Sequence, residues 1–249
     1  MRWWGVLFAM ALAVAGLAQV VTRGPIVIRS ESDLYGLAKG FGTNLSPFVI
    51  EGLRIDANAE PFGILIANFS HPLVLRNLEV YGASIAAIRL QNVQNVSLEN
   101  VVVRGSATGI FLSGSRKITL KGCRIENCGD GMRLMFAETI TIEGITVSKA
   151  EIGIWFQGTR SASLSRSTIR DCGLGLLFEL ESAGNVVAEN AFLNNQVHAY
   201  SEGRNQFDNG KRGNFWEGFV AEDREGDGIF DQAYFIGSDT DRFPLVSPP

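Results

Sequence analysis

The chain has few of the residues that cross-link small exported domains or build metal centres. Its 249 residues include only three cysteines, two histidines and four methionines. An odd number of cysteines does not indicate a disulfide framework. Soft sulfur and imidazole ligands for copper are equally scarce. The three thiols are therefore predicted to have a packing role in the core.

An excess of positive charge is also absent. Lysine and arginine together number 22 against 26 aspartates and glutamates, a net charge of -4, which excludes a nucleic-acid binder held by a basic field. Hydrophobic residues make up 46% of the chain and charged residues 19%, which excludes intrinsic disorder. The 28 glycines and 16 phenylalanines, with only seven prolines, favour many short strands and tight turns, so we expect an all-β fold.

Long apolar runs are missing except at the start of the chain. Arg2 precedes an apolar run from Trp3 to Leu17, and small residues lead to Ala18. This order predicts a signal peptide over residues 1–18. A membrane anchor is the alternative, but the run is short for a spanning helix, which needs about 20 apolar residues. Since the mature chain contains no further transmembrane candidate, we expect a periplasmic or secreted protein.

The middle of the chain repeats with a period of 22 residues. Four segments with strand-like alternation begin 22 residues apart, at Val96, Ile118, Ile140 and Ala162. A second set has glycines at the same spacing, namely Gly109, Gly131, Gly153 and Gly175. Each repeat thus predicts two strands joined by turns, and related segments upstream and downstream extend the pattern to about seven coils of 22–25 residues.

This periodicity predicts a single-stranded parallel β-helix, in which each coil stacks on the previous one. A β-sandwich is the alternative, but it gives no reason for strands, glycines and turns to keep one common period. We expect an N-terminal cap over 19–47, the β-helix over 48–212 and an irregular C-terminal segment over 213–249.

Stacking turns the period into columns of side chains, which can be assigned by subtraction. Two columns are predicted to face the core: Ile88, Ile110, Met132, Ile154 and Leu176, and then Leu90, Leu112, Leu134, Phe156 and Phe178. A column of small residues contains Cys128 and Cys172 two coils apart, roughly 9.6 Å at the spacing between strands and beyond disulfide reach. We therefore predict free, buried thiols.

An outward column between these two core columns has an unusual composition for a solvent-facing strand. It contains Leu65, Arg89, Phe111, Arg133, Trp155 and Leu177, and a neighbouring column adds Met135 and Gln157. Aromatic, arginine, methionine and amide groups are enriched in recognition surfaces. This face is the predicted partner-binding site, for a protein or a glycan. The alternative is that the segment from Val20 to Pro47, or a second copy of the chain, covers it.

Three acidic residues are the weak candidates for catalysis. Asp130 and Glu151 precede the second strands of neighbouring coils, and Asp171 lies in a turn one coil further on. Paired carboxylates in different environments can act as acid and base. Acidic turn residues also serve as solvated caps, so no catalytic residue is assigned.

A C-terminal acidic loop is the candidate metal site. Asp223, Glu225, Asp227 and Asp231, with Gly228, follow the spacing D-x-[DE]-x-D-G-x-x-D, which suits a hard cation such as calcium. Tyr234 stands where the bidentate glutamate of an EF-hand would lie, and an ordinary acidic turn is the alternative. The remaining candidate ligands for copper are His71, His198, Met132 and Met135. Their spacing favours packing methionines and isolated surface histidines.

With these residues identified, the chain resembles the NosD-like family of exported right-handed parallel β-helix proteins. GFGTNLSPFVIEGLRID, from Gly40 to Asp56, resembles the family's G-x-G-T-x-x-x-P-[YF]-x-I entry into the first coil. GNFWEGFVAEDREGDGIFDQAYFI and DRFPLV, within Gly213 to Val246, resemble its closing G-N-[YF]-W, D-G-D-G-x-x-D and D-[RY]-[YF]-P-L segments.

The resemblance implies a periplasmic accessory in copper-site maturation of nitrous oxide reductase, acting with an ABC transporter. It implies a partner among copper enzymes, copper chaperones and transporter subunits. Copper itself is expected only because of this resemblance. A non-enzymatic binding protein is therefore the leading hypothesis. A β-helix that binds or cleaves polysaccharides is the alternative, although the chain has no G-H-G motif.

Overall fold

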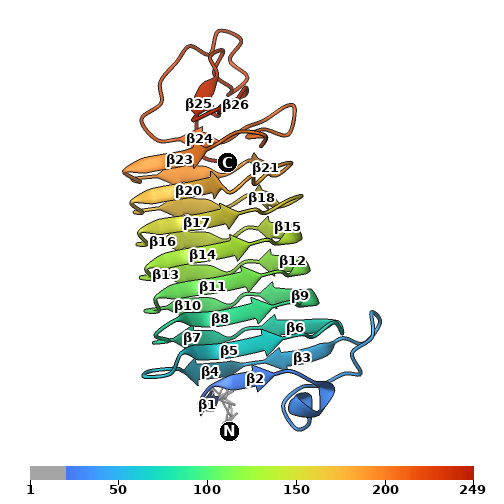
Figure 1. Cartoon of the computed structure of the whole chain (residues 1–249). Helices are drawn as coiled ribbons and strands as arrows, with labels where there is room; N and C mark the ends of the chain where they lie inside the picture. The colour runs from blue at the N-terminus through green and yellow to red at the C-terminus, as the bar shows by residue number, and fades with distance from the viewer. Residues whose placement is uncertain (1–20) are drawn as a thin grey trace, which may run out of the picture.

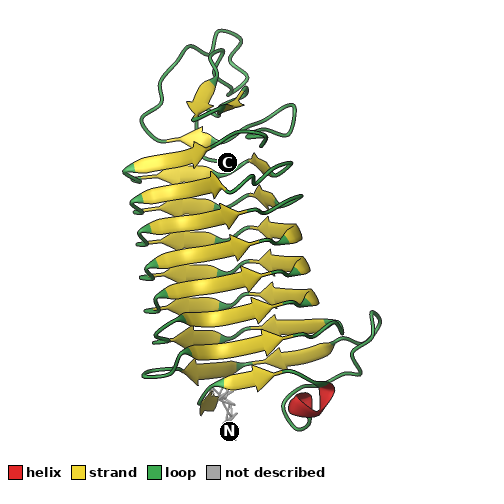
Figure 2. Ribbon diagram, viewed as in Figure 1, coloured by secondary structure: helices red, strands yellow, loops and turns green. Residues whose placement is uncertain are grey.

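The protein is a parallel β-solenoid built from three long sheets and a small C-terminal extension (Figures 1 and 2). The computed structural model describes residues 21–249, so the predicted signal peptide lies outside the described residues. Each complete turn of the solenoid contributes one strand to each sheet, and the sheets run along the stack. The predicted parallel β-helix is confirmed.

The strands are grouped here by sheet. The nine-stranded sheet contains β1 (Val21–Arg23), β4 (Leu53–Asp56), β7 (Glu79–Tyr81), β10 (Val102–Arg104), β13 (Arg124–Glu126), β16 (Thr146–Ser148), β19 (Thr168–Arg170), β22 (Ala191–Leu193) and β24 (Phe215–Trp216). The eight-stranded sheet contains β2 (Ile26–Ile28), β5 (Phe62–Ala67), β8 (Ala86–Gln91), β11 (Thr108–Ser113), β14 (Asp130–Met135), β17 (Ile152–Gln157), β20 (Leu174–Glu179) and β23 (Val197–Ser201). The seven-stranded sheet contains β3 (Phe48–Glu51), β6 (Leu73–Arg76), β9 (Gln94–Glu99), β12 (Arg116–Lys121), β15 (Glu138–Glu143), β18 (Ser163–Ser165) and β21 (Val186–Ala188).

Each turn of the solenoid has three strands where the sequence pattern predicts two. The segment from Val96 to Val103, read as one strand, is divided between β9 and β10. Asn100 lies at the division with a φ of 52°, and Gly122 occupies the equivalent corner with a φ of 61°. A residue in the left-handed region turns the chain sharply. Hydrophobic alternation continues through such a corner, which is why periodicity alone does not reveal it.

The solenoid begins earlier than residue 48. Strands β1 and β2 pair in parallel with β4 and β5, so residues 21–28 already supply two sides of a first turn. The eight-stranded sheet accordingly indicates about eight turns, one more than the pattern predicts. The 3-10 helix η1 (Glu31–Leu34) follows β2 and places Leu34 in the core.

The two predicted core columns are in register and buried. Ile110 pairs with Ile88 and Met132, and Leu112 pairs with Leu90 and Leu134. All ten side chains of the two columns are at most 1% exposed. The Phe156 and Phe178 rings stack at 4.2 Å, as expected for neighbours in one column. A continuous apolar core therefore runs along the solenoid.

The three thiols are free and buried, as predicted. Cys123, Cys128 and Cys172 are 1%, 6% and 2% exposed. Burial raises the pKa of all three thiols, that of Cys123 to about 11. These groups pack as small apolar residues.

The C-terminal segment folds over the last turn of the solenoid. It contains a two-stranded antiparallel sheet, β25 (Tyr234–Ile236) and β26 (Asp239–Asp241). Trp216, 1% exposed, stacks between Phe192 at 4.4 Å and Tyr234 at 4.5 Å. The segment thus covers apolar rings at this end. Within residues 21–249, helical segments long and apolar enough to cross a membrane are absent.

Candidate functional site

The outward column of the eight-stranded sheet forms a continuous ladder along the solenoid. Parallel pairing aligns Arg89 with Phe111, Phe111 with Arg133 and Arg133 with Trp155. We call this column the ladder face; its members are Val27, Leu65, Arg89, Phe111, Arg133, Trp155, Leu177 and Tyr200. The register therefore brings together the residues that the 22-residue subtraction selects.

Arginine and aromatic side chains alternate on the ladder face and stack on one another. The Arg89 guanidinium carbon lies 5.0 Å from the centre of the Phe111 ring. That of Arg133 lies 5.7 Å from Phe111 and 4.3 Å from Trp155. Phe62, outside the column, extends the series at 5.4 Å from Arg89. Each cation is thus held between two aromatic rings, at distances typical of cation–π attraction.

The stack partly buries its own polar groups. Nε of Arg89 and Nε1 of Trp155 are buried and have no hydrogen-bond partner among residues 21–249. Arg133 Nε instead donates to Gln157 Oε1 at 2.7 Å, and Gln157 Nε2 donates to Glu179 Oε1 at 2.9 Å. The face is therefore a set of rigid side chains that order one another, and Met135 lies half-buried beside Gln157.

The ladder face is open within the part of the chain that the structure describes. Figure 1 shows the eight-stranded sheet turned toward the viewer, and η1 with the loop to β3 lies to one side of the stack. The segment 21–47 therefore does not cover the ladder face, because β2 continues the eight-stranded sheet at one end. Val27 and Tyr200, at the two ends of the ladder, are 47% and 48% exposed.

The three acidic candidates do not form one cluster. Asp130 begins β14, half-buried; burial raises the pKa of its carboxyl group, nearby Glu151 raises it too, and Arg133 opposes both. Asp171 lies at another corner, where it pairs with Arg170 at 2.7 Å and accepts a hydrogen bond from Asn194. Asp130 and Glu151 therefore interact, whereas Asp171 has a structural role.

The acidic C-terminal loop uses its carboxylates to hold its own backbone. Asp223 accepts hydrogen bonds from Gly226 and Gly228 at 2.8 and 3.1 Å, and Asp227 accepts one from Ile229 at 2.9 Å. Asp231 accepts one from the backbone of Arg224 at 3.2 Å, while Glu225 is exposed.

Calcium binding by this loop stays a prediction. Across residues 21–249, clusters of three or more histidine, cysteine, aspartate or glutamate side chains that could hold a metal ion are absent. If the loop binds calcium, millimolar Ca²⁺ raises the melting temperature through linkage. Asp227→Asn should remove the shift. An unchanged melting temperature would mean that these acids serve only as caps of the turn.

The soft ligands do not fit a resident copper site. The three thiols lie in the core, where burial raises their pKa values, and Met132 is fully buried. His71 Nε2 lies 2.9 Å from Glu31, and His198 Nε2 lies 2.8 Å from the Glu217 carbonyl oxygen. The donors are thus dispersed and engaged, and no step of copper chemistry is derived from them.

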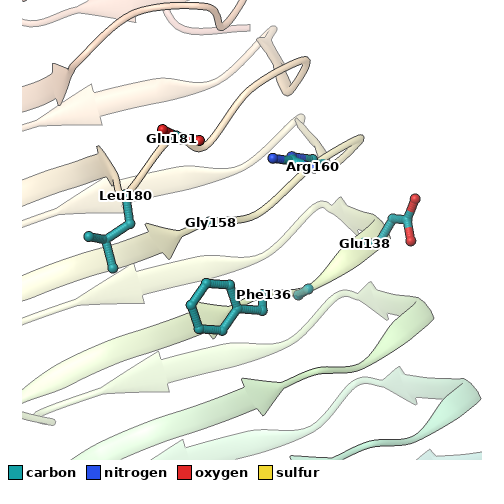
Figure 3. A pocket seen from close by; sticks show the side chains of 7 residues that line it. Phe136, Glu138, Gly158, Arg160, Leu180 and Glu181 are labelled. Carbon is teal, nitrogen blue, oxygen red and sulfur yellow. The ribbon is translucent and has the colours of Figure 1, made fainter.

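The structure also reveals a hollow that the sequence pattern did not identify. It lies at the corner between the eight- and seven-stranded sheets and has a volume of about 340 Å³. Figure 3 shows Phe136 and Leu180 on either side of Gly158, with Arg160 across the hollow and Glu138 pointing away. The available signal was a Gly-x-Arg triplet at 158–160 that repeats 114–116, two periods earlier.

Comparison with known proteins gives one family and several distant structures. The family described as "Periplasmic copper-binding protein (NosD)" matches residues 28–221. No curated protein sequence matches the chain.

Among solved structures, the complex of XylC with xylose has a TM-score of 0.52 at 11% identity, covering 65% of this chain and 35% of that one. The AlgE6 mannuronan C-5 epimerase A-module of Azotobacter vinelandii has a TM-score of 0.45 at 12% identity, covering 64% and 62%. An alginate lyase from Paenibacillus sp. has a TM-score of 0.42 at 12% identity, covering 74% and 95%. The chain thus spans about a third of XylC and less than two thirds of the epimerase module. The XylC likeness shows the fold alone.

Proposed function

The chain belongs to the NosD family of periplasmic copper-binding proteins, and from this membership we propose that it is an exported accessory that docks on a protein partner during copper-site assembly. The observation that carries the proposal is the ladder face, on which Arg89, Phe111, Arg133 and Trp155 stack in alternation. Leu177 continues the ladder, and Met135 and Gln157 flank it.

The ladder face has the chemistry of an interaction surface. Arginine and tryptophan are enriched among the residues that dominate binding energy, and aromatic residues and methionine are enriched at interfaces. Because each side chain is already held by its neighbours, docking costs little side-chain entropy. The guanidinium groups supply a planar fork for carboxylates, so an acidic partner surface with apolar contacts matches this face best.

In this proposal the metal ligands belong to the partner. Apart from the half-buried Met135, the soft donors of residues 21–249 are buried or engaged in other contacts, which supports a role in docking over one in direct copper ligation. We propose that the partner is a periplasmic copper enzyme, a copper chaperone or a subunit of an ABC transporter. Maturation of nitrous oxide reductase is the process that the family resemblance implies.

The test is capture of purified partners by the mature chain and by a variant of the ladder face. Phe111→Ala with Trp155→Ala should abolish capture of a copper enzyme or transporter subunit. Three cation–π contacts worth about 0.5–1 kcal/mol each are lost, so the free energy of unfolding should fall by only about 1.5–3 kcal/mol. The matched control is Thr119→Ala with Ser163→Ala, on the same two turns but on the seven-stranded sheet.

Two outcomes contradict the proposal. Capture that is unchanged in the ladder variant would place the interface elsewhere. Equal loss of capture in the control would mean that binding does not depend on this face.

A second candidate function is cleavage of a polysaccharide, favoured by one observation. The half-buried Asp130 has a raised pKa beside Glu151 and Arg133, as expected of a general acid with a charged neighbour. Asp130→Asn with Glu151→Gln should remove turnover of a polysaccharide substrate. Turnover that persists in this variant would exclude the pair.

A further inference from the structure

Two neighbouring hollows lie along the corner between the eight- and seven-stranded sheets. One has a volume of about 340 Å³ and is lined by Gly158 and Arg160. The other, about 360 Å³, is lined by Gly114 and Arg116. The two glycines are 44 residues apart, as are the two arginines, which equals two 22-residue repeats. One hollow lies over the turns of Asn68, Asn92 and Gly114, and the other lies over the next three, those of Phe136, Gly158 and Leu180. Together they form what we call the corner groove.

The charges along the corner groove alternate. Arg116 is in register with Glu138 in β15, and the backbone of Glu138 pairs in parallel with that of Arg160 in the next turn. The two arginines are therefore about 9.6 Å apart along the stack, with a carboxylate between them. Such an arrangement attracts anions at the two arginines, and Glu138 points away from the hollow.

Neither arginine is neutralised by the residues that the structure describes. Within residues 21–249, Arg116 and Arg160 form no ion pair within 4.0 Å, and Arg116 Nε donates to the neutral Gln94 at 3.0 Å. On the seven-stranded sheet itself, Arg76 and Lys121 do pair with glutamates. The corner arginines are thus available to an external anion.

An exposed aromatic ring lines the groove where the two hollows meet. Phe136 lies in the corner column between Gly114 and Gly158 and is 63% exposed. Its ring lies over Gly158, where an added Cβ would approach the Phe136 Cδ1 atom to 2.6 Å. Its φ is 50°, a conformation that costs a bulky residue roughly 1–2 kcal/mol. Asn92 and Leu180, in the same corner column, share this conformation with φ values of 51° and 52°, so it belongs to the corner.

We propose that the corner groove binds a linear polyuronate, a polysaccharide whose sugar units carry carboxylates. The face of a sugar ring stacks on Phe136, since an aromatic ring presents a flat apolar surface. Carboxylates of two alternate units contact Arg116 and Arg160, because guanidinium and carboxylate groups form paired hydrogen bonds. The unit between them is the one that stacks on Phe136, which lies on the intervening turn, and Glu138 points away from the hollow.

The spacing favours a sugar chain over an acidic peptide. An extended peptide repeats its side chains on one face about every 6.6 Å, which does not match arginines about 9.6 Å apart. Alternate units of an extended sugar chain are separated by a distance comparable to two turns of the solenoid. The groove is also distinct from the ladder face, because its residues lie at the corner after β11, β14 and β17.

The test measures binding of polygalacturonate to the full chain by titration calorimetry, with fully methyl-esterified polygalacturonate as the uncharged probe. We expect binding of the charged polymer only. Arg116→Gln and Arg160→Gln should each weaken it about tenfold, the effect of losing one charge-assisted hydrogen-bonding pair. Arg124→Gln, on the nine-stranded sheet, removes the same charge from another face and should leave binding unchanged.

Phe136→Asn separates a binding role from a structural one. Asn92 occupies the equivalent corner with a φ of 51°, and asparagine tolerates this conformation. The variant should lose binding while its melting temperature stays the same or rises. Failure of the native chain to bind, equal binding of the esterified polymer, or an equal effect of Arg124→Gln would overturn the proposal. Phe111→Ala with Trp155→Ala should retain polyuronate binding, so failure here and failure of partner docking are distinguishable.

Discussion

Individual residues differ in how far their burial changes their chemistry. Cys123, Cys128 and Cys172 are all held in the apolar core, where desolvation disfavours the thiolate. Asp241 is a buried carboxylate that accepts hydrogen bonds from Asn214, Trp216 and Phe243. The same physical effect, loss of water around a charge, makes the thiols inert and the carboxyl group easier to protonate.

The first prediction concerns thiol reactivity. Because only the thiolate reacts and burial raises the pKa of Cys123 to about 11, a thiol reagent at pH 8 should label none of the three cysteines in the folded chain. In denaturant all three should react. The absorbance of the chromophore that the reagent releases measures the extent of labelling in the folded and in the denatured chain. Rapid labelling of the native protein would show that at least one thiol is accessible.

The second prediction concerns the protonation of Asp241. Burial raises the pKa of its carboxyl group from 3.8 to about 6, although hydrogen bonds from Asn214, Trp216 and Phe243 oppose this effect. The folded chain therefore holds a proton that the unfolded chain has released between about pH 4 and pH 6. The stability contribution of Asp241 should thus fall by about 3 kcal/mol as the pH rises through this range.

Carbon-detected NMR titration of the Asp241 carboxyl group measures this pKa directly. A midpoint near 6 is expected, and a midpoint below 4 would contradict the prediction. Urea unfolding of Asp241→Asn across the same pH range provides the control, because the variant lacks this titration.

At the scale of elements, close approach between neighbouring turns is maintained by a column of glycines. An added Cβ at Gly153 would lie 2.5 Å from the Gly175 carbonyl oxygen and 2.8 Å from Ile169 Cγ2. Gly131 meets the Gly153 carbonyl in the same way. The glycines at the start of the strands in the eight-stranded sheet are therefore required by packing between turns, and backbone atoms cannot yield to a methyl group.

The third prediction follows from this packing. Gly153→Ala should lower the free energy of unfolding by about 1–3 kcal/mol, the usual effect of overpacking a core. Gly24→Ala is the control, because an added Cβ there meets no atom within 4 Å. Urea denaturation of both variants measures the effect. Equal stability of the two variants would show that the turns can move apart without cost.

At the scale of the whole molecule, the solenoid is a one-dimensional stack whose ends need protection. The last turn is followed by β24, and Trp216 packs on Phe192 while its indole nitrogen donates to Asp241. Arg242 pairs with the buried Asp208 at 2.6 Å and ties the end of the chain to the same region. These contacts keep the open edge of the stack from presenting unpaired strands.

The fourth prediction concerns this end. A chain that stops at Arg212 lacks β24 and the contacts of Trp216 and Asp241, so β22 becomes an exposed edge. We expect such a chain to form larger assemblies than the full chain at the same concentration. Light scattering coupled to size-exclusion chromatography compares the two. If the two chains form species with the same number of subunits, the C-terminal segment does not protect the edge.

The sequence by itself determined the repeat, the inward columns and the ladder face. A fixed period of 22 residues places residue i beside residue i+22, so subtraction alone assigned Ile110 to the core and put Phe111 next to Arg133. No knowledge of the turns was needed for this, because parallel stacking preserves register as long as the period holds.

Only the tertiary structure decided where the chain turns and what meets at the corners. Left-handed residues such as Asn100 divide segments whose hydrophobic pattern is continuous, so three strands replace two. The corner groove depends on Phe136, Gly158 and Arg160, whose side chains meet only after this turn is made. The period of the sequence predicts which residues are neighbours along a column. A site at a corner depends also on the direction of the backbone and on the space beside a glycine, which has no side chain.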